Sequence, residues 1–517
     1  MTGLKKNTMR TTLAVTILVF LSKAGGFIRE MITAAYFGTT MENDAYVAAY
    51  GLFNIPVLLF NSCITSTLVP LYMEALHNIS EKRANRFASN AMNLSALASI
   101  VVSIIMYALA YPLTKLVYPG FELEAQNLTA QLTQIMMPGL AFFVVTIVIS
   151  TVLNARERYM AAQLTGFPLS ISLIVAAVVF SGSMGIQAVA FGVVAAGILQ
   201  IVVLAPFLSK FFKYSFYINL RDKRVHRMLT LAVPAIITMS VNEINHMVDR
   251  SLASGLSAGD MSAMNYAFRL VTFVLGVLLV PLTTIMFSKM SERAVDHDKK
   301  GIIAIVKQCT EVIALAILPI VVVAITQSSD VIRLAYKRGA FDESSVSRTA
   351  IAFAFYMVGV LGFGLRDLFN RAFHSLQDTR TPMAVAMGSV IVNVVLNLIL
   401  VNVMGMGGLA LATSIAGIAS AVVLLIILRQ RLGRMGVTDI LEQLLKIGIS
   451  GVLCALCCVM LGGMLPAAQT ALQSFVRLVV VTGCSLIVYI GSVIVLRVRQ
   501  VDVLVSMIRP AKKTKGK

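Results

Sequence analysis

The sequence predicts an all-α polytopic membrane protein with about 14 transmembrane helices. Of its 517 residues, 58% are hydrophobic and only 13% are charged, whereas soluble domains carry about 25% charged residues. The mean hydropathy is +0.85. Apolar runs of about 20 residues, long enough to cross the hydrocarbon core of a bilayer, recur from one end of the chain to the other. A chain of this composition cannot cover itself with polar surface, so we expect much of its surface to contact the lipid bilayer.

Breaks in the hydropathy place the individual spans. Polar, proline or glycine residues interrupt the apolar runs at intervals that suit helices of membrane-crossing length. The predicted spans lie near residues 11–37, 43–75, 86–114, 128–154, 160–182, 184–209, 228–255, 259–288, 302–326, 346–374, 380–403, 405–429, 440–466 and 472–497.

Two related halves and a C-terminal helix pair are the predicted organisation. A motif of small and aromatic residues recurs at Asn43–Ala48 and Ser262–Ala267, and transporters built from internal repeats hold their site between the halves. The predicted architecture is therefore two six-helix lobes around a central cavity, followed by two further helices. The predicted boundaries are 1–215 for the N-terminal lobe, 216–434 for the C-terminal lobe, 435–500 for the last two spans and 501–517 for a basic cytoplasmic tail.

The charges of the loops predict the orientation of the spans. The formal net charge is +19, and basic residues concentrate in alternate loops such as Glu81–Arg86 and Lys210–Arg227. Because cytoplasmic loops carry an excess of Lys and Arg, this alternation puts both termini in the cytoplasm. It also fits a membrane protein better than a nucleic-acid-binding surface. The run Val331–Arg338 is basic but falls on the outer side, and we interpret it as a short amphipathic surface segment.

The motifs give little support for catalysis. The sequence contains no GxxxxGK[ST] loop for ATP, no Ser-His-Asp set and no paired carboxylates in a soluble pocket. The six cysteines lie in apolar segments without a set of histidines, which indicates small apolar side chains rather than a metal site. We therefore expect a carrier with no catalytic residues, metal or cofactor, and not an enzyme.

The first predicted span carries charges at a depth where charges are costly. Lys23, Arg29 and Glu30 lie within the run 11–37, and an ionisable side chain at the bilayer centre costs at least about 2.5–3.5 kcal/mol. Such residues face a partner or a water-filled cavity and indicate a functional site. Lys23 and Glu30 are seven residues apart and share one helix face. Gly25-Gly26 between them permits either the close approach of a neighbouring helix or a bend.

The seventh predicted span carries a polar stripe. Its members are Asn242, Glu243, Asn245, His246, Asp249 and Arg250. Asn242, His246 and Asp249 follow i, i+4, i+7 spacing, which puts them on one helix face. A helix with such a side suits the wall of a hydrated cavity, and interhelical hydrogen bonds are the alternative interpretation.

Positive charge dominates the predicted interior. The eighth span adds Asn265 and Arg269, one helical turn apart. Together with Lys23 and Arg29, Arg269 gives an excess of cations inside the membrane. Because the planar fork of arginine pairs well with phosphate and carboxylate oxygens, the sequence predicts an anionic substrate headgroup, either phosphate or pyrophosphate.

Motifs spread over nearly the whole chain are similar to those of one known transporter family. They are Lys23–Glu30, Phe37-Gly38, Asp44-Ala45-Tyr46, Val69-Pro70, Asn265–Leu270 and Phe373–Pro382. These motifs resemble the lipid II flippases (MurJ, also called MviN) of the multidrug/oligosaccharidyl-lipid/polysaccharide exporter superfamily. The resemblance implies alternating access between the two lobes, which carries the undecaprenyl-pyrophosphate-linked peptidoglycan precursor from the inner to the outer leaflet of the bacterial inner membrane. It implies contact with membrane lipids and a groove for the lipid tail at the last two helices, and cell-wall synthesis enzymes are candidate partners.

The resemblance also assigns roles to particular residues. Lys23 stands where arginine is common in the family, and Arg29 and Arg269 match cavity arginines, so these three are the candidates for binding the pyrophosphate headgroup. Asp44 matches an acid at the cavity rim. The candidates for lining the cavity or gating it are Glu30, Asp44, Asn242, Glu243, His246, Asp249, Arg250 and Asn265.

The chain departs from the family pattern at two places. The stretch Asn54–Phe60 in the second span carries no charge, whereas the family often has an arginine there. Phe268 stands where some members have an acid. Arg250 is the candidate to supply the phosphate-contacting charge that the second span lacks.

Three other functions are weighed against a lipid II flippase. An exporter of another polyprenyl-linked oligosaccharide would share the same features. A cation-coupled multidrug antiporter is disfavoured by the cationic interior and the extra helices. A scaffold for wall enzymes that transports nothing would tolerate the loss of Arg29 and Arg269.

Overall fold

The computed structural model describes residues 2–433, 435–466, 468 and 470–500. Over these residues the structure is helical and contains no strand, which confirms the predicted fold class. Twelve described helices are long and apolar enough to cross a membrane. The predicted spans 11–37 and 228–255 correspond to two further long helices, α1 (Thr2–Phe37) and α11 (Lys223–Ala253), which carry the charged residues. The predicted number of spans is thus approximately right, and the predicted basic tail 501–517 lies outside the described residues.

The chain divides into two compact units. Unit 1 contains the described residues of 1–265 together with 338–342, and unit 2 contains those of 266–337 and 343–517. The predicted lobe boundaries at 215 and 434 stay predictions.

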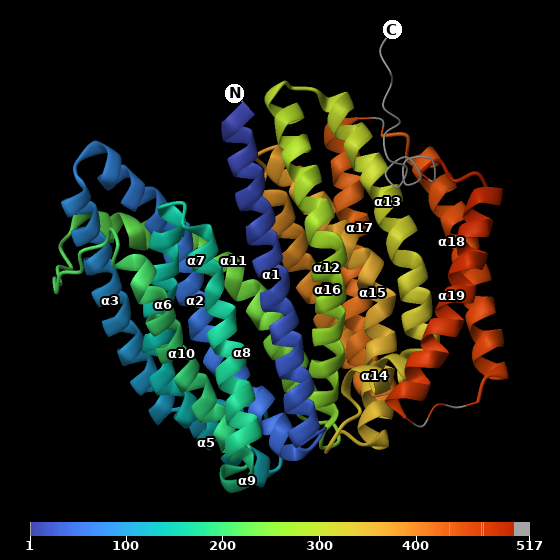
Figure 1. The fold of residues 1–517 in the computed structure, drawn as a ribbon, viewed down its shortest axis with the longest axis horizontal. Helices are drawn as coiled ribbons and strands as arrows, with labels where there is room; N and C mark the ends of the chain where they lie inside the picture. The colour runs from blue at the N-terminus through green and yellow to red at the C-terminus, as the bar shows by residue number, and fades with distance from the viewer. Residues whose placement is uncertain (1, 434, 467, 469, 501–517) are drawn as a thin grey trace. The chain divides into compact units, whose positions relative to one another are not determined.

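Unit 1 holds the first eleven helices. Besides α1 and α11 they are α2 (Met41–Asn78), α3 (Glu81–Ala108), α4 (Ala110–Val117), α5 (Leu123–Met136), α6 (Leu140–Ala155), α7 (Tyr159–Ala162), α8 (Gly166–Val175), α9 (Ser181–Met184) and α10 (Gln187–Leu208). The predicted span 128–154 is α5 and α6 in line, joined by a 3₁₀ turn, and the span 160–182 is the broken series α7 to α9. Figure 1 shows α1 and α8 side by side, in agreement with their packing.

The remaining helices belong to unit 2, apart from the first turn of α12. They are α12 (Asp260–Val295), α13 (Lys299–Thr326), α14 (Ser328–Tyr336), α15 (Glu343–Ser375), α16 (Arg380–Met404), α17 (Met406–Leu432), α18 (Val437–Met464) and α19 (Ala471–Val495). The last two are neighbours (Figure 1) and correspond to the predicted spans 440–466 and 472–497.

The break between α5 and α6 shows how the membrane interior tolerates irregular backbone. Met137–Gly139 forms a 3₁₀ turn around Pro138, because proline removes a backbone donor and obstructs the preceding turn. The hydroxyl of Ser103 on α3 donates to the carbonyl oxygen of Met137 at 2.6 Å. A neighbouring helix thus satisfies a backbone group at the break, as a lipid environment requires.

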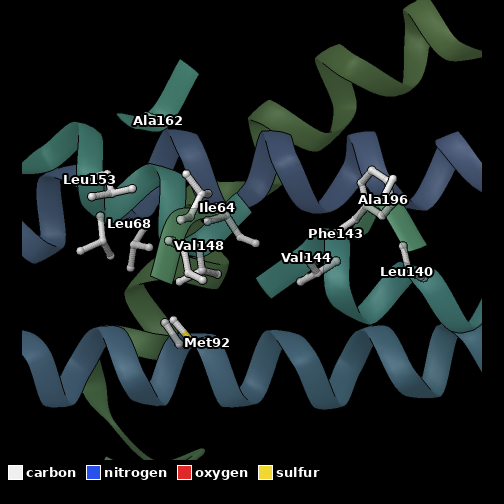
Figure 2. Close-up of a cluster of buried hydrophobic side chains, with 14 of the residues drawn as sticks. Ile64, Leu68, Met92, Leu140, Phe143, Val144, Val148, Leu153, Ala162 and Ala196 are labelled. Carbon is white, nitrogen blue, oxygen red and sulfur yellow. The ribbon is translucent and has the colours of Figure 1, made fainter. Parts of the chain in front are cut away.

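The core of unit 1 lies where α2, α3, α6 and α10 meet. Figure 2 shows Ile64 and Leu68 of α2 beside Val148 of α6, with Met92 of α3 below them. These side chains are almost completely buried. Since lipid tails are as apolar as these side chains, close van der Waals packing rather than water exclusion holds such helices together in a bilayer.

In unit 2 a buried acid ties α14 to the C-terminal helix pair. Asp330 on α14 pairs with Arg333 at 2.9 Å and with Arg477 on α19 at 3.3 Å. It also accepts a hydrogen bond from the hydroxyl of Ser474 at 3.1 Å. Arg333 pairs in addition with Glu343 at the start of α15. Asp330 on α14 therefore binds α19 through Arg477. Arg333, which is also on α14, binds α15 through Glu343.

The expectation of a short amphipathic segment at Val331–Arg338 is confirmed, except that a basic residue, Arg333, lies on its buried face. The residues form most of α14, as an amphipathic pattern allows, but Ile332 and Tyr336 are fully buried and Arg333 is almost so. The reason is that Asp330 and Glu343 neutralise Arg333 inside the fold. Counting basic residues along the sequence could not reveal these partners.

Asp378 holds the start of α16. Its carboxylate accepts hydrogen bonds from the backbone N–H groups of Arg380 and Thr381 and from the Thr381 hydroxyl, at 2.7–3.1 Å. It also pairs with Arg431. Burial raises the pKa of the Asp378 carboxyl, but these hydrogen bonds and the charge of Arg431 outweigh burial and hold the pKa below its usual value.

We expect Asp378→Ala to lower the free energy of unfolding by about 1–2 kcal/mol at neutral pH, because the helix loses its cap. A carboxyl whose folded-state pKa is lowered contributes stability above its unfolded pKa of about 4, and this stability is lost as the pH falls through the folded-state pKa. The difference in thermal stability between wild type and Asp378→Ala should therefore shrink as the solution is acidified below about pH 4. A difference that does not change with pH would contradict the role of the ionised carboxylate.

Candidate functional site

The charged pair of α1 is a direct ion pair inside the helix bundle. Nη2 of Arg29 lies 2.7 Å from Oε1 of Glu30, and both side chains are largely buried. Arg29 is eight residues from the end of α1 at Phe37, about 12 Å along the helix axis. This depth is inside the hydrocarbon region for a helix that crosses the membrane. Glu30 therefore compensates the charge of Arg29 and orients its guanidinium group.

Two tyrosines of α2 surround the same arginine. The phenols of Tyr46 and Tyr50 lie close enough to act electrostatically on the Arg29 charge, and their rings are 6.1 Å apart. Sequence reasoning missed both as site residues, although Tyr46 belongs to the motif Asp44-Ala45-Tyr46. Arg29 thus sits between a carboxylate and two polar aromatic rings, an environment that can hold a cation and still leave it donors for an anion.

Lys23 stands apart from this pair. Its side chain is exposed on α1, about four helix turns from Phe37. A Cβ atom added to Gly26 would have no atom within 4 Å apart from the backbone of its own helix. A Cβ atom added to Gly25 would make only ordinary van der Waals contact with Ser170 of α8. The close approach of α1 and α8 occurs instead at Gly166, where an added Cβ atom would overlap the Ser22 hydroxyl. The α1 helix runs unbroken through Gly25-Gly26.

Asp44 is a buried link between the start of α2 and the start of α12. It is 3% exposed and accepts hydrogen bonds from Gly259 N–H at 2.6 Å, from Ser262 N–H at 2.7 Å and from the Ser262 hydroxyl at 2.6 Å. The first N–H groups of a helix lack partners within the helix, and the helix dipole favours a negative charge at this position. A carboxylate from α2 therefore caps α12.

The side chain of Arg250 extends from α11 and contacts α2. A Cβ atom added to Gly51 of α2 would overlap Nη1 of Arg250 and lie 3.1 Å from the Tyr118 hydroxyl. The Arg250 guanidinium group acts electrostatically on the Tyr118 hydroxyl, which donates to the carbonyl oxygen of Ala48 at 3.1 Å. The guanidinium group therefore lies against α2 one turn before Asn54, where the uncharged stretch of the second span begins. The absence of a side chain at Gly51 makes room for it.

This arrangement predicts unequal effects of two glycine substitutions. Gly51→Ala should displace the Arg250 guanidinium group from α2 and reduce transport several-fold, since the new methyl group occupies its place. Gly26→Ala on α1 should leave transport unchanged and stabilise the helix by about 0.5–1 kcal/mol, because alanine costs less conformational entropy. Transport assays and thermal melts of the two purified variants test the pair. Equal transport by both variants would contradict the packing of Arg250 on Gly51.

The polar stripe predicted for the seventh span lies on α11, which packs against α2. Glu243, Asn245, His246 and Asp249 are all partly buried. Arg250 acts electrostatically on Glu243 two turns away along the same helix. The side chain of Asn242 lies outside the described residues. The described members of the stripe therefore form a partly enclosed polar surface on α11.

Arg269 and Asn265 lie one turn apart on α12, and both are partly buried. Phe268 between them packs its ring against Tyr356 of α15 at 5.3 Å. Arg269 belongs to unit 2 and Arg29 to unit 1, so their convergence on one substrate stays a prediction.

The described residues contain no group of three or more His, Cys, Asp or Glu side chains that could hold a metal ion. The polar groups that the fold does bring together are a cation paired with an acid on α1, a second cation against α2, and the buried Asp44 link. Sequence reasoning missed Tyr118 and Ser262 in these contacts, because neither residue is charged and each meets its partner only through packing.

The fold and this charged interior define the class of protein as a multi-pass helical membrane transporter. Two solved structures share the fold. One, described as "Lipid II flippase MurJ, inward closed conformation", has a TM-score of 0.80 at 24% identity and covers 96% of this chain and 100% of its own. The other, an inward-facing multidrug resistance MATE family transporter of the MOP superfamily, has a TM-score of 0.69 at 14% identity and covers 81% of this chain and 97% of its own.

Sequence comparison then identifies the family. The sequence model described as "Lipid II flippase MurJ" matches residues 33–481. A lipid II flippase MurJ from Burkholderia cenocepacia is 28% identical over 82% of this chain and 84% of its own length. A probable lipid II flippase MurJ from Rickettsia prowazekii is 28% identical over 79% and 81%. The chain belongs to the MurJ family of lipid II flippases, as the sequence motifs predict.

Proposed function

We propose that this protein moves lipid II from the inner to the outer leaflet of the bacterial inner membrane by alternating access. The observation that carries the proposal is the ion pair of Arg29 and Glu30, buried at bilayer depth in α1 of a chain from the MurJ family. A membrane helix retains such charges where they serve a pathway or a binding site. A diphosphate is the ligand that a buried arginine fork suits best.

In this proposal three cations, Arg29, Lys23 and Arg269, bind the headgroup, and Arg250 is the candidate for a fourth. Arg29 donates to the diphosphate while Glu30 and the two α2 tyrosines hold its guanidinium group in place. Lys23 and Arg269 supply further positive charge, and Arg250 adds the charge that the second span lacks. The undecaprenyl tail lies in a groove at α18 and α19, so that only the polar headgroup enters the cavity.

Gating is assigned to the polar contacts of α2, α11 and α12. Asp44 holds the starts of α2 and α12 together, and Arg250 of α11 packs against Gly51 of α2. The helix bundle opens at this end only when these contacts break. Asn242, Glu243, His246, Asp249 and Asn265 line the path. Both termini face the cytoplasm, and the protein acts without a catalytic residue or a resident cofactor.

The test is a leaflet-orientation assay for lipid II in cells from which the protein is depleted. We expect lipid II to accumulate in the inner leaflet and wall synthesis to stop. Outward movement that continues after complete depletion, in cells without a second flippase, would refute the proposal. Accumulation of a different polyprenyl-linked glycan, with lipid II normally distributed, would instead assign the protein to the export of that glycan.

A further inference from the structure

The connection between α10 and α11 is an ordered segment without a helix or strand. It comprises residues 209–222 and lies along the first half of α3 (Figure 1). Asn90 of α3 makes two hydrogen bonds to the backbone of Asn219, at 2.8 and 3.0 Å. Asn93 donates to the carbonyl oxygen of Tyr217 at 3.1 Å, and the hydroxyl of Ser89 accepts from Ser215 N–H at 3.2 Å. Polar side chains of α3 thus fix the backbone of the connection.

The side chains of this connection alternate between two environments. Ser215, Tyr217 and Asn219 are partly buried, and Arg86 of α3 stacks on the Tyr217 ring at 3.9 Å. The intervening residues Tyr214, Phe216, Ile218 and Leu220 are all exposed. An alternation with a period of two is typical of extended backbone. The hydroxyl of Tyr214 donates back to Oδ1 of Asn93 on α3 at 2.8 Å. The bonds to α3 therefore hold three outward apolar side chains, those of Phe216, Ile218 and Leu220, away from the protein.

The outward row is too apolar for a surface in contact with water. Phe216 is 81% exposed and Leu220 is 68% exposed. Single exposed apolar residues are common, but a contiguous apolar patch marks a site that contacts a membrane or another molecule. Because the backbone is fixed by α3, the row cannot fold inward to bury itself.

Basic residues flank this row on both sides. Residues 209–227 contain six Lys and Arg residues and a single acid, Asp222. Asp222 is occupied in capping α11, where it accepts from Arg224 N–H at 2.9 Å. Lys210 and Lys213 precede the apolar row, and Arg221 and Lys223 follow it, all four exposed. The surface therefore combines apolar side chains with an excess of positive charge, as segments that bind anionic membranes do.

The position of the row along α3 matches the edge of the hydrocarbon region. Asn93 is the last α3 residue that binds the connection. Leu97 follows one turn later, about 6 Å along the axis, and begins the series of exposed apolar residues that continues through Ile100 and Ile104. In a membrane-crossing helix such residues face lipid tails. The connection therefore lies at the level of the lipid headgroups.

We propose that the α10–α11 connection is an interfacial anchor that binds the anionic lipid surface at this end of unit 1. The three outward side chains, Phe216, Ile218 and Leu220, enter the boundary between headgroups and acyl chains. Lys213, Arg221 and Lys223 contact lipid phosphates and carboxylates. Charge complementarity and continuity with the lipid-facing side of α3 select a lipid surface as the occupant rather than another protein.

The chain contains no tryptophan, so a single introduced tryptophan reports on one position. We would reconstitute full-length Phe216→Trp in nanodiscs of phosphatidylcholine, with or without phosphatidylglycerol. The matched control is Val295→Trp, at a position 79% exposed at the end of α12 among charged residues. We expect the indole of Phe216→Trp to emit at shorter wavelength than that of Val295→Trp, to be quenched by lipids brominated near the headgroup, and to show a several-fold lower acrylamide quenching constant. Phosphatidylglycerol should strengthen each effect.

A further variant isolates the electrostatic part. Lys213→Gln/Arg221→Gln/Lys223→Gln, added to Phe216→Trp, should reduce the effect of phosphatidylglycerol to the level seen in phosphatidylcholine alone. Retention of the full phosphatidylglycerol effect would overturn the assignment to anionic lipid. If acrylamide quenches Phe216→Trp and Val295→Trp equally in both kinds of nanodisc, the anchor does not exist, and a protein partner becomes the explanation of the apolar row.

Discussion

Arg29→Ala should abolish outward movement of lipid II and fail to support growth as the only copy of the protein. Two causes act together. The variant removes the guanidinium group that we assign to the diphosphate, and it removes the cation that lies 2.7 Å from the Glu30 carboxylate in the native protein. Removing one member of a buried ion pair costs about 3–5 kcal/mol. The measurements are complementation of a depletion strain and the amount of protein in the membrane.

The double variant Arg29→Ala/Glu30→Ala separates these two causes. It removes both charges, so no uncompensated carboxylate is left in the membrane and the protein should recover most of its abundance and thermal stability. Transport should remain lost, because the diphosphate still lacks its arginine. If the double variant transports lipid II, Arg29 serves only to neutralise Glu30, and the assignment of Arg29 to the headgroup is wrong.

The second large effect is expected for Asp44→Ala. This change removes the acceptor of three hydrogen bonds at the start of α12. Hydrogen bonds to a charged group contribute about 1.5–3 kcal/mol each, so the free energy of unfolding should fall by about 3 kcal/mol or more and transport should fail. Thermal unfolding of the purified protein and complementation measure the two consequences.

Ser262→Ala is the matched control for Asp44→Ala. It removes only the hydroxyl donor and keeps both backbone donors, the N–H groups of residues 259 and 262, on the carboxylate. Its effect on stability should be about 1 kcal/mol, and transport should persist. Equal stability of the two variants would mean that the carboxylate does not cap α12.

The helices and their charged faces follow from the sequence because hydropathy and helical period act locally. Apolar runs located the spans of α2 through α19, and the spacing of Asn242, His246 and Asp249 predicted a polar stripe on one helix. The charged residues of α1 and α11 lie within stretches that the sequence predicts as membrane spans. Ionisable residues are costly to insert into a membrane, so their presence within a span indicates a functional site.

The partners of these charges could not be predicted, since they depend on packing between distant segments. Asp44 binds Gly259 and Ser262, more than 200 residues away in sequence. The close approach of α1 to a neighbouring helix was expected at Gly25-Gly26, but it occurs at Gly166 of α8. Periodicity assigns a residue to a helix face, whereas only the folded chain determines which neighbour meets that face.

The most direct test of the central claim uses lipid II in reconstituted vesicles. Wild-type protein and the Arg29→Ala/Glu30→Ala variant would be inserted at equal amounts and orientation, and the fraction of lipid II exposed on the outer surface followed over time. The account predicts transfer by the wild type, inhibition of that transfer by undecaprenyl pyrophosphate, and no transfer by the variant. Transfer by the variant at the wild-type rate, with the same sensitivity to undecaprenyl pyrophosphate, would show that the α1 charges do not recognise the diphosphate.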